Sequence, residues 1–219
     1  MMVYMNITDF EFVGHISAKI CHDLASSLSA LSNAVEFIDV KDLNIRTKAI
    51  EIINTSSNQT LDILRLFREI YGAAKYEGEA DLLHIKNCCT KLAAHSSLRL
   101  DFLVPSTLPK EMLLNVYMGK LLLALFCYVK QKLIHGGNIA VSVNKIDNNN
   151  LLKVSISGQD MKIKKDHDSI LLGAVVDKIS PNNIEPYYIA KLLKTLKASM
   201  TISYNNDNID YIVNYPSIG

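Results

Sequence analysis

The 219-residue chain is 49% hydrophobic and 21% charged, which is enough apolar sequence for one or two globular domains and excludes a largely disordered protein. Its formal net charge is +1 with both signs interleaved, so charge gives no reason to expect nucleic acid or an anionic membrane as a partner. The N-terminus has no basic stretch followed by an apolar one, and the longest apolar run, 121–129, is too short to cross a bilayer. We therefore expect a cytoplasmic protein whose partners are proteins.

The N-terminal segment predicts a long amphipathic helix over about residues 8–39. Thr8-Asp9-Phe10-Glu11 is a capping box, which marks the start of a helix. Apolar side chains then recur at alternating spacings of three and four, as on a helix that packs against other helices. The positions of this stripe are Cys21, Leu24, Leu28, Leu31, Val35 and Ile38.

A second amphipathic helix is predicted over about residues 47–72, after a short polar connection at 39–46. The two helices form a hairpin. Their apolar stripes are too broad for one intramolecular contact to cover. We therefore expect the hairpin to pair with a second copy into a four-helix bundle, which makes the protein a homodimer, or to be covered by the rest of the chain.

His22 lies one position past the stripe of the first helix, so we expect it on the flank, open to solvent or to a docking partner. Asp23 can accept a hydrogen bond from one ring nitrogen and leave the other as a nucleophile. A lone helical histidine is more often structural or simply solvated, and that alternative stays open here. The positions that share its face at helical spacing are His15, Lys19, Ser26, Ser29 and Asn33.

The cysteines show no spacing typical of metal ligands, and each stands in an apolar helical context. We expect them to be buried free thiols, because cysteine behaves there as a small hydrophobic residue. Adjacent cysteines cannot form an ordinary disulfide with each other without strain. The four residues are Cys21, Cys88, Cys89 and Cys127.

A small and polar segment, 72–79, separates the hairpin from sequence of a different character, and we place the two domains at 1–74 and 80–219. Strand pairs that alternate with helices predict an α+β sandwich with helices on one face of a mostly antiparallel sheet. The expected helices are 81–95, 109–134, 169–176 and 186–197. The expected strands are 98–104, 139–146, 151–157, 200–204 and 211–215.

A histidine-bearing hairpin followed by this order of elements resembles the histidine kinases with their ATP-binding domains. The run His22-Asp23-Leu24-Ala25-Ser26 is similar to the H-box of those kinases, although Ser27 stands where the box usually has proline. Together with Cys21 before that run and with Glu185-Pro186-Tyr187-Tyr188, it most resembles the ChpT-type histidine phosphotransferases of the alphaproteobacterial cell-cycle phosphorelay. The resemblance covers nearly the whole chain.

Three features of the ATP-binding kinases are missing where the resemblance puts them. Helix 121–134 lacks the asparagine that holds magnesium. Residues 155–160 stand where kinases have the Asp-x-Gly-x-Gly adenine site, but their lone glycine, Gly158, precedes Asp160 instead of following it. The loop 182–188, which should be rich in glycine, contains a proline and two tyrosines. The resemblance therefore implies a degenerate ATP-binding-like α/β domain that holds no cofactor and no metal.

The resemblance further implies a histidine phosphotransferase and not an ATP-dependent kinase. His22 would accept a phosphoryl group from the receiver domain of a hybrid histidine kinase and pass it to the receiver domains of response regulators, while Asp23 orients the imidazole. Magnesium would sit on the partner receiver domain. His15 has no acidic neighbour and is expected to be a bystander. The docking face would include Lys19, Ser26, Ser29 and Asn33.

Two alternatives come from other classes of protein. The first is a sensor-type kinase that phosphorylates itself from ATP; the missing asparagine and glycine-rich loop argue against it, and a nucleotide titration would discriminate. The second is a purely structural dimerisation module in which the histidine is incidental. A His22 side chain that is buried or salt-bridged would favour this second alternative.

Overall fold

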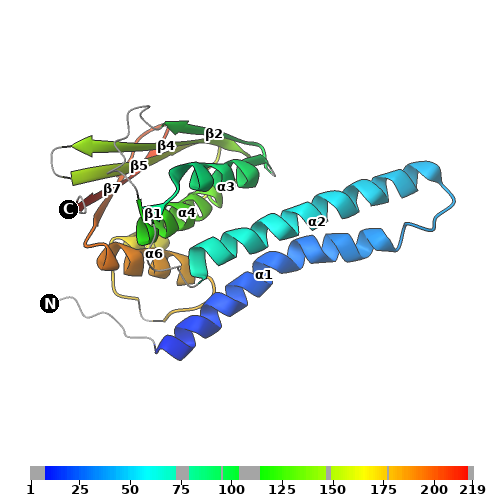
Figure 1. Ribbon diagram of the computed structural model, residues 1–219, viewed down its shortest axis with the longest axis horizontal. Helices are drawn as coiled ribbons and strands as arrows, with labels where there is room; N and C mark the ends of the chain where they lie inside the picture. The colour runs from blue at the N-terminus through cyan, green and yellow to red at the C-terminus, as the bar shows by residue number, and fades with distance from the viewer. Residues whose placement is uncertain are drawn as a thin grey trace.

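The computed structural model describes residues 8–72, 79–94, 96–103, 114–146, 149–176 and 178–216. Two long helices, α1 (Asp9–Val35) and α2 (Leu43–Tyr71), form the predicted hairpin, which projects from an α/β unit containing the other described elements (Figure 1). No described helix is both long and apolar enough to cross a membrane. The predicted domain boundary falls mostly on residues outside the described ranges, so the limits 1–74 and 80–219 stay a prediction.

Hydrogen bonds at the helix starts explain where the hairpin helices begin. The capping box at the start of α1 is confirmed, since the Glu11 amide donates to Thr8 Oγ1 at 3.2 Å and the Thr8 amide donates to Glu11 Oε2 at 2.9 Å. Asp42 caps α2 by accepting from the Asn44 amide at 2.8 Å. Because of this cap, α2 begins at Leu43 and not near residue 47 as predicted.

The α/β unit is built on one five-stranded sheet with the order β2-β4-β5-β7-β6. β2 runs parallel to β4, and the other neighbours are antiparallel, so the predicted mostly antiparallel sheet is confirmed. A separate short pair joins β1 (Glu79–Ala80) to β3 (Leu114–Asn115). The bounds of the main strands are Leu98–Leu103 for β2, Gly137–Ile146 for β4, Asn149–Ser157 for β5, Ser199–Tyr204 for β6 and Ile209–Pro216 for β7.

Helices α3 (Leu82–Ala94), α4 (Val116–Lys130) and α6 (Ile184–Thr195) lie between the sheet and the hairpin (Figure 1). α4 is the centre of the core, because most of its residues are buried from Met118 to Val129. Its predicted start, Pro109, lies outside the described residues, and the described helix begins only at Val116, because Leu114 and Asn115 form β3. α5 (Lys165–Leu171) begins earlier than the predicted helix 169–176.

The apolar stripe predicted for α1 is not its buried face. Ile16, Ser27 and Ala34 are buried, whereas Leu28 and Val35 are each 48% exposed. The small side chains allow close approach of α2, where Thr60 Oγ1 donates to Ser27 Oγ at 2.9 Å. Two polar residues therefore belong to the helix contact, and part of the predicted stripe remains uncovered.

The cysteines are free thiols, as predicted, but they are not all buried. Cys89 is buried, Cys88 and Cys127 are partly exposed, and Cys21 is exposed on α1. Cys21 belongs to the uncovered stripe of that helix, which is why the expectation of burial is wrong for it.

A buried polar network ties α4, α5 and the last two strands together. The Asp168 carboxylate accepts hydrogen bonds from Tyr128 Oη at 2.8 Å and from Tyr211 Oη at 3.2 Å on one oxygen. Its other oxygen accepts from Tyr204 Oη at 2.8 Å and from Lys132 Nζ at 3.1 Å. Burial lowers the pKa of Lys132, and Asp168 opposes that shift. The network thus depends on one carboxylate.

Replacing Asp168 with alanine is expected to destabilise the fold by about 3 to 5 kcal/mol, because it leaves the Lys132 ammonium and three hydroxyl groups without their acceptor. Urea unfolding measures the change in free energy. Asp166→Ala is the matched control, since that carboxylate is exposed on the same helix and its loss is expected to cost no more than about 0.5 kcal/mol. Equal effects of the two changes would contradict a structural role for the network.

Candidate functional site

His22 lies in the middle of α1 and points into solvent, with 85% of its side chain exposed. Successive side chains are about 100° apart around the axis of α1. Around this axis, His22 lies about 120° from the buried Ile16 on one side and about 120° from the uncovered Leu28 on the other. α1 therefore has a buried face, an uncovered apolar face and a polar face. His22 is on the polar face, where another protein can reach it.

Asp23 contacts the His22 imidazole at Nδ1. Its Oδ1 lies 3.2 Å from His22 Nδ1, and its Oδ2 forms an ion pair with Lys19, one turn earlier on α1. When Nδ1 carries the proton and donates it to Asp23, Nε2 keeps a free lone pair and faces solvent. The three side chains thus present a nucleophilic nitrogen in one ring orientation.

The predicted docking residues divide into two groups. Ser26, Ser29 and Asn33 are exposed and lie within about 40° of His22 around the helix axis. Lys19 is different, because its side chain is only 14% exposed and is turned toward Asp23. His15, the expected bystander, is partly buried on the same helix.

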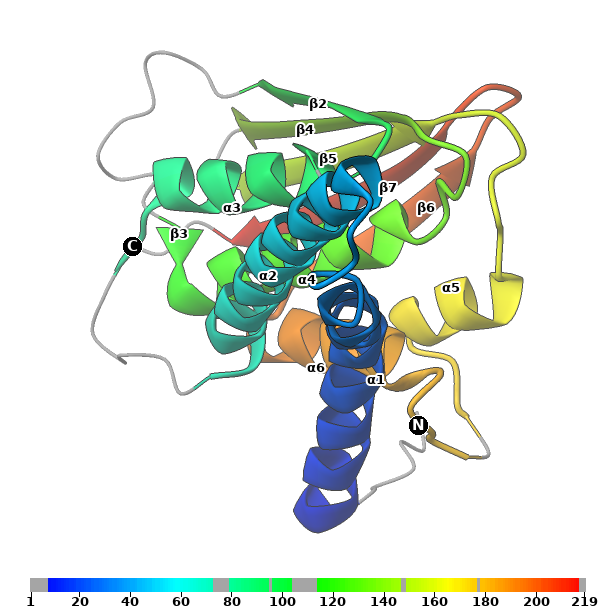
Figure 2. The same ribbon diagram turned by 90° about the vertical axis from the view of Figure 1, so that its right-hand side faces the viewer.

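The second domain packs directly against the base of the hairpin, with α6 alongside α1 in both views (Figures 1 and 2). Phe12 stacks on Tyr188 with ring centroids 6.1 Å apart, and Tyr188 contacts Tyr71 at 5.0 Å. Tyr188 Oη donates to the Ile70 carbonyl at 2.6 Å. The segment 185–188, which the sequence marks as family-like without a role, is therefore one part of the contact between the hairpin and the α/β unit, beside the packing of α2 on α3 and α4.

Glu185, in the first turn of α6, is the charged residue of this contact that sequence reasoning missed. Its carboxylate is 7% exposed and accepts a hydrogen bond from Gln131 Nε2 at 2.7 Å. Burial raises the pKa of Glu185, and the Lys19 ammonium is the strongest interaction that opposes this shift. The sequence signals were its place in the family-like segment 185–188 and in the first turn of a helix, where a solvated acidic residue is the ordinary expectation.

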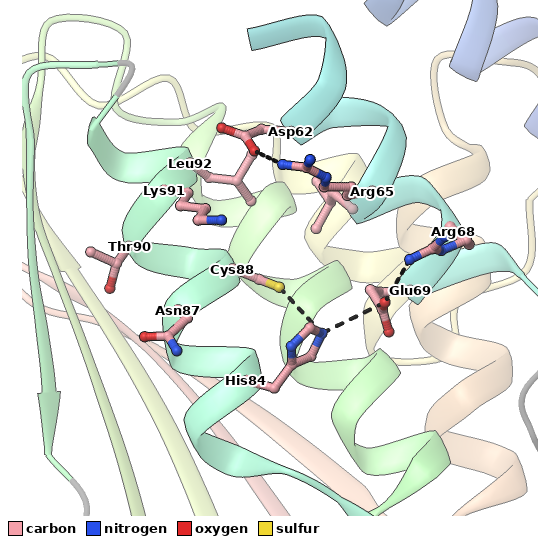
Figure 3. Close-up of a pocket in the computed structure, with 11 residues that line it drawn as sticks. Asp62, Arg65, Arg68, Glu69, His84, Asn87, Cys88, Thr90, Lys91 and Leu92 are labelled. Atoms are coloured by element: carbon pink, nitrogen blue, oxygen red, sulfur yellow. Dashed lines mark hydrogen bonds and ion pairs between the residues drawn. The ribbon is translucent and has the colours of Figure 1, made fainter. Parts of the chain in front are cut away.

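An open cleft of about 440 Å³ lies between α2 and α3, away from His22 (Figure 3). In it, Arg65 pairs with Asp62 at 3.2 Å, and Glu69 Oε1 lies 3.6 Å from His84 Nε2. Burial and neighbouring carboxylates raise the pKa of the Cys88 thiol, which disfavours a reactive thiolate. The Cys88 thiol of the cleft is thus not activated as a nucleophile. Among the residues that the structure describes, no group of three or more His, Cys, Asp or Glu side chains could hold a metal.

Comparisons with known proteins agree with this architecture. A family model described as the histidine phosphotransferase C-terminal domain matches residues 83–208, more than half of the chain. The Protein phosphotransferase ChpT of Brucella abortus (strain 2308) is 24% identical over 206 residues, which are 93% of this chain and 94% of that protein.

Solved structures show the same fold. A structure of a bacterial phosphotransferase at 1.7 Å has a TM-score of 0.83 and 19% identity, with 95% of this chain and 98% of that chain covered. The histidine kinase AdeS of Acinetobacter baumannii has a TM-score of 0.51 and 13% identity, with 90% and 98% covered. The predicted order of a helical hairpin and a histidine-kinase-like α/β domain is thus confirmed. The chain belongs to the histidine phosphotransferase family and is a ChpT-type protein.

Proposed function

We propose that this protein carries a phosphoryl group on His22 from the receiver domain of a hybrid histidine kinase to the receiver domains of response regulators. The observation that supports this most is the exposed imidazole, held at Nδ1 by Asp23 on a helix face without bulky neighbours. Membership of the histidine phosphotransferase family supports the same chemistry. Such partners are cytoplasmic in this proposal, and so is the chain.

In the transfer step, the Nε2 lone pair of His22 attacks the phosphorus of an aspartyl phosphate. The bond from phosphorus to the carboxylate oxygen breaks, and its electron pair stays on the aspartate of the receiver domain. The ring then bears substituents on both nitrogens and a positive charge, which the Asp23 carboxylate faces. Passing the group to a second receiver domain reverses these bond changes.

The partner supplies the magnesium ion and most of the charge stabilisation in this proposal, and this chain binds no cofactor or metal. Its own contribution is a positioned nucleophile and a surface for docking. Ser26, Ser29 and Asn33 form the exposed part of that surface, and Lys19 adds a positive charge beside it. The polar, uncrowded face fits a receiver domain that approaches along α1.

The structure offers no support for an ATP-dependent kinase. Along helix 121–134, Tyr128 is already bonded to the buried Asp168, as is Lys132 just after α4. The segment 182–188, where kinases have a glycine-rich loop, enters α6 and packs its tyrosines against the hairpin. Two of the three places where the resemblance puts nucleotide-binding residues are thus used for internal packing.

The structural-module alternative is weakened by the exposure of His22, although the contact with Asp23 becomes an ion pair when the imidazole is protonated. A dimer and a transfer function are also compatible. We propose a homodimer formed through the uncovered apolar face of the hairpin, which would complete a four-helix bundle. That face includes Leu28 and Val35 of α1 and Ile50, Leu61 and Leu64 of α2, all between 44% and 48% exposed.

The transfer proposal predicts that the protein gains an acid-labile, base-stable phosphate when mixed with phosphorylated receiver domains of the same genome. His22→Ala should abolish this labelling and leave the helical content unchanged, because the side chain makes no contact with the core. Radiolabelled transfer followed by acid and base treatment measures it. His15→Ala is the control and should label normally. Labelling of His22→Ala at the parent rate would remove the assignment.

ATP and ADP with magnesium are predicted to bind negligibly, because the residues that hold the adenine, the metal and the phosphates in kinases are absent. Isothermal titration calorimetry should give no binding heat. An ATP-binding histidine-kinase domain titrated under the same conditions is the control. Micromolar affinity of this chain for either nucleotide would instead favour the kinase alternative.

The dimer proposal predicts that the protein sediments as a stable dimer at micromolar concentration. Leu28→Glu should dissociate it, since an unpaired charge would enter the apolar interface. Sedimentation velocity of both proteins tests this. Leu83→Glu is the matched control, because that leucine is 63% exposed on α3, outside the hairpin, and its replacement should leave the dimer intact. A monomeric parent protein would exclude the proposed interface.

A further inference from the structure

Lys19 is the predicted docking residue whose side chain is mostly covered. Only 14% of that side chain is exposed, whereas Ser26, Ser29 and Asn33 are exposed on the docking face. The Lys19 ammonium is ion-paired with Asp23 Oδ2, one turn later on α1. In the free protein its charge thus acts on Asp23 and not on a docking partner.

The contact between Asp23 and His22 is not one that helix geometry provides by itself. Neighbouring side chains on an α-helix diverge by about 100° and do not face each other. Asp23 Oδ1 nevertheless lies 3.2 Å from His22 Nδ1, so the carboxylate is turned from its own direction toward the histidine. The Asp23 side chain is 28% exposed, and water competes for its oxygens. A second contact is needed to hold it in this position.

Lys19 supplies this second contact from the required direction. At about 100° per residue, Lys19 lies between Asp23 and His22 around the axis of α1, about 40° from the first and about 60° from the second. A carboxylate that turns from Asp23 toward Lys19 therefore also turns toward His22. Its two oxygens are then divided, with Oδ2 at the ammonium and Oδ1 at Nδ1 of the ring.

Helix stability does not explain this ion pair. A lysine that precedes an acidic residue by four positions stabilises a helix less than the reverse order does. The pair also lies in the middle of α1, where the helix dipole favours neither charge. Both side chains are partly covered, which costs solvation that a fully exposed pair would keep. The specific effect of the pair is thus on where the Asp23 carboxylate points.

We propose that Lys19 is a positioning residue for His22, which turns the Asp23 carboxylate toward Nδ1 and so favours the ring tautomer with the proton on Nδ1 and a free Nε2. Its role is then within the chain, and not in contact with the phosphoryl group or the partner. The consequence for transfer rests on the proposed function, whereas the tautomer itself can be measured without any partner.

The first experiment measures the tautomer of neutral His22 by long-range ¹H–¹⁵N NMR of the full chain, with His22→Ala to assign the ring signals. Lys19→Met removes the ammonium and keeps an unbranched side chain, so the helical content should not change. The fraction of His22 with its proton on Nδ1 should fall in this variant. Lys19→Arg should keep the parent fraction, because a guanidinium can still pair with Asp23.

The second experiment measures single-turnover transfer from the receiver domain that labels the parent protein fastest. Lys19→Met should slow transfer about tenfold, because small displacements of reacting groups are costly, and should leave the dissociation constant for the receiver domain unchanged. In an Asp23→Asn background, the same change should add no further slowing, since Lys19 then has no carboxylate to turn.

Lys48→Met is the matched control. Lys48 is an exposed lysine in the second turn of α2, toward the end of the hairpin that projects away from the α/β unit (Figure 1). Its replacement removes the same charge from the hairpin and should change neither the tautomer nor the transfer rate.

An unchanged tautomer in Lys19→Met would overturn the inference. So would equal slowing with and without the Asp23 carboxylate, since Lys19 would then act on the phosphoryl group or the partner directly. Both results would leave the transfer function standing. If the parent protein accepts no phosphate, the proposed function fails, and the NMR measurement still decides the role of Lys19.

Discussion

The contact of α4 and α6 with the base of the hairpin is the constraint on which the rest of the structure depends. The last carbonyls of a helix have no partners within it, and here Tyr188 donates to Ile70 and Lys120 Nζ donates to Gly72 at 2.5 Å. Both donors come from the second domain. The end of α2 is thus held by hydrogen bonds to carbonyl groups that have no partner within the helix.

This contact also determines which way α1 faces. Since Ile16 must meet Ile184 and the small Ser27 must meet Thr60, the helix can turn only one way about its axis. The histidine face and the uncovered apolar face then both point away from the chain. A single helix thus serves the core, a second copy in the proposed dimer, and a docking partner in the proposed transfer.

Local signals in the sequence predicted much of the fold, because they depend on neighbouring residues. The capping box of Thr8 and the alternating strands are of this kind, and so is the exposed position of His22 next to Asp23. The buried face of α1 was not predictable in the same way, because the buried Ser27 bonds to Thr60, 33 residues away in the chain. The burial of Glu185 was missed for the same reason, since it depends on packing beside Gln131, 54 residues earlier in the chain.

One consequence of the exposed imidazole concerns the order in which partners bind in the proposed relay. A donor and an acceptor would have to approach the same Nε2 from the same side, so one His22 could not serve both at once. Exchange at each histidine would follow a ping-pong order, in which the first protein leaves before the second arrives. The protein adds no energy of its own, so the relative amounts of phosphorylated and unphosphorylated partners would set the net direction of flow.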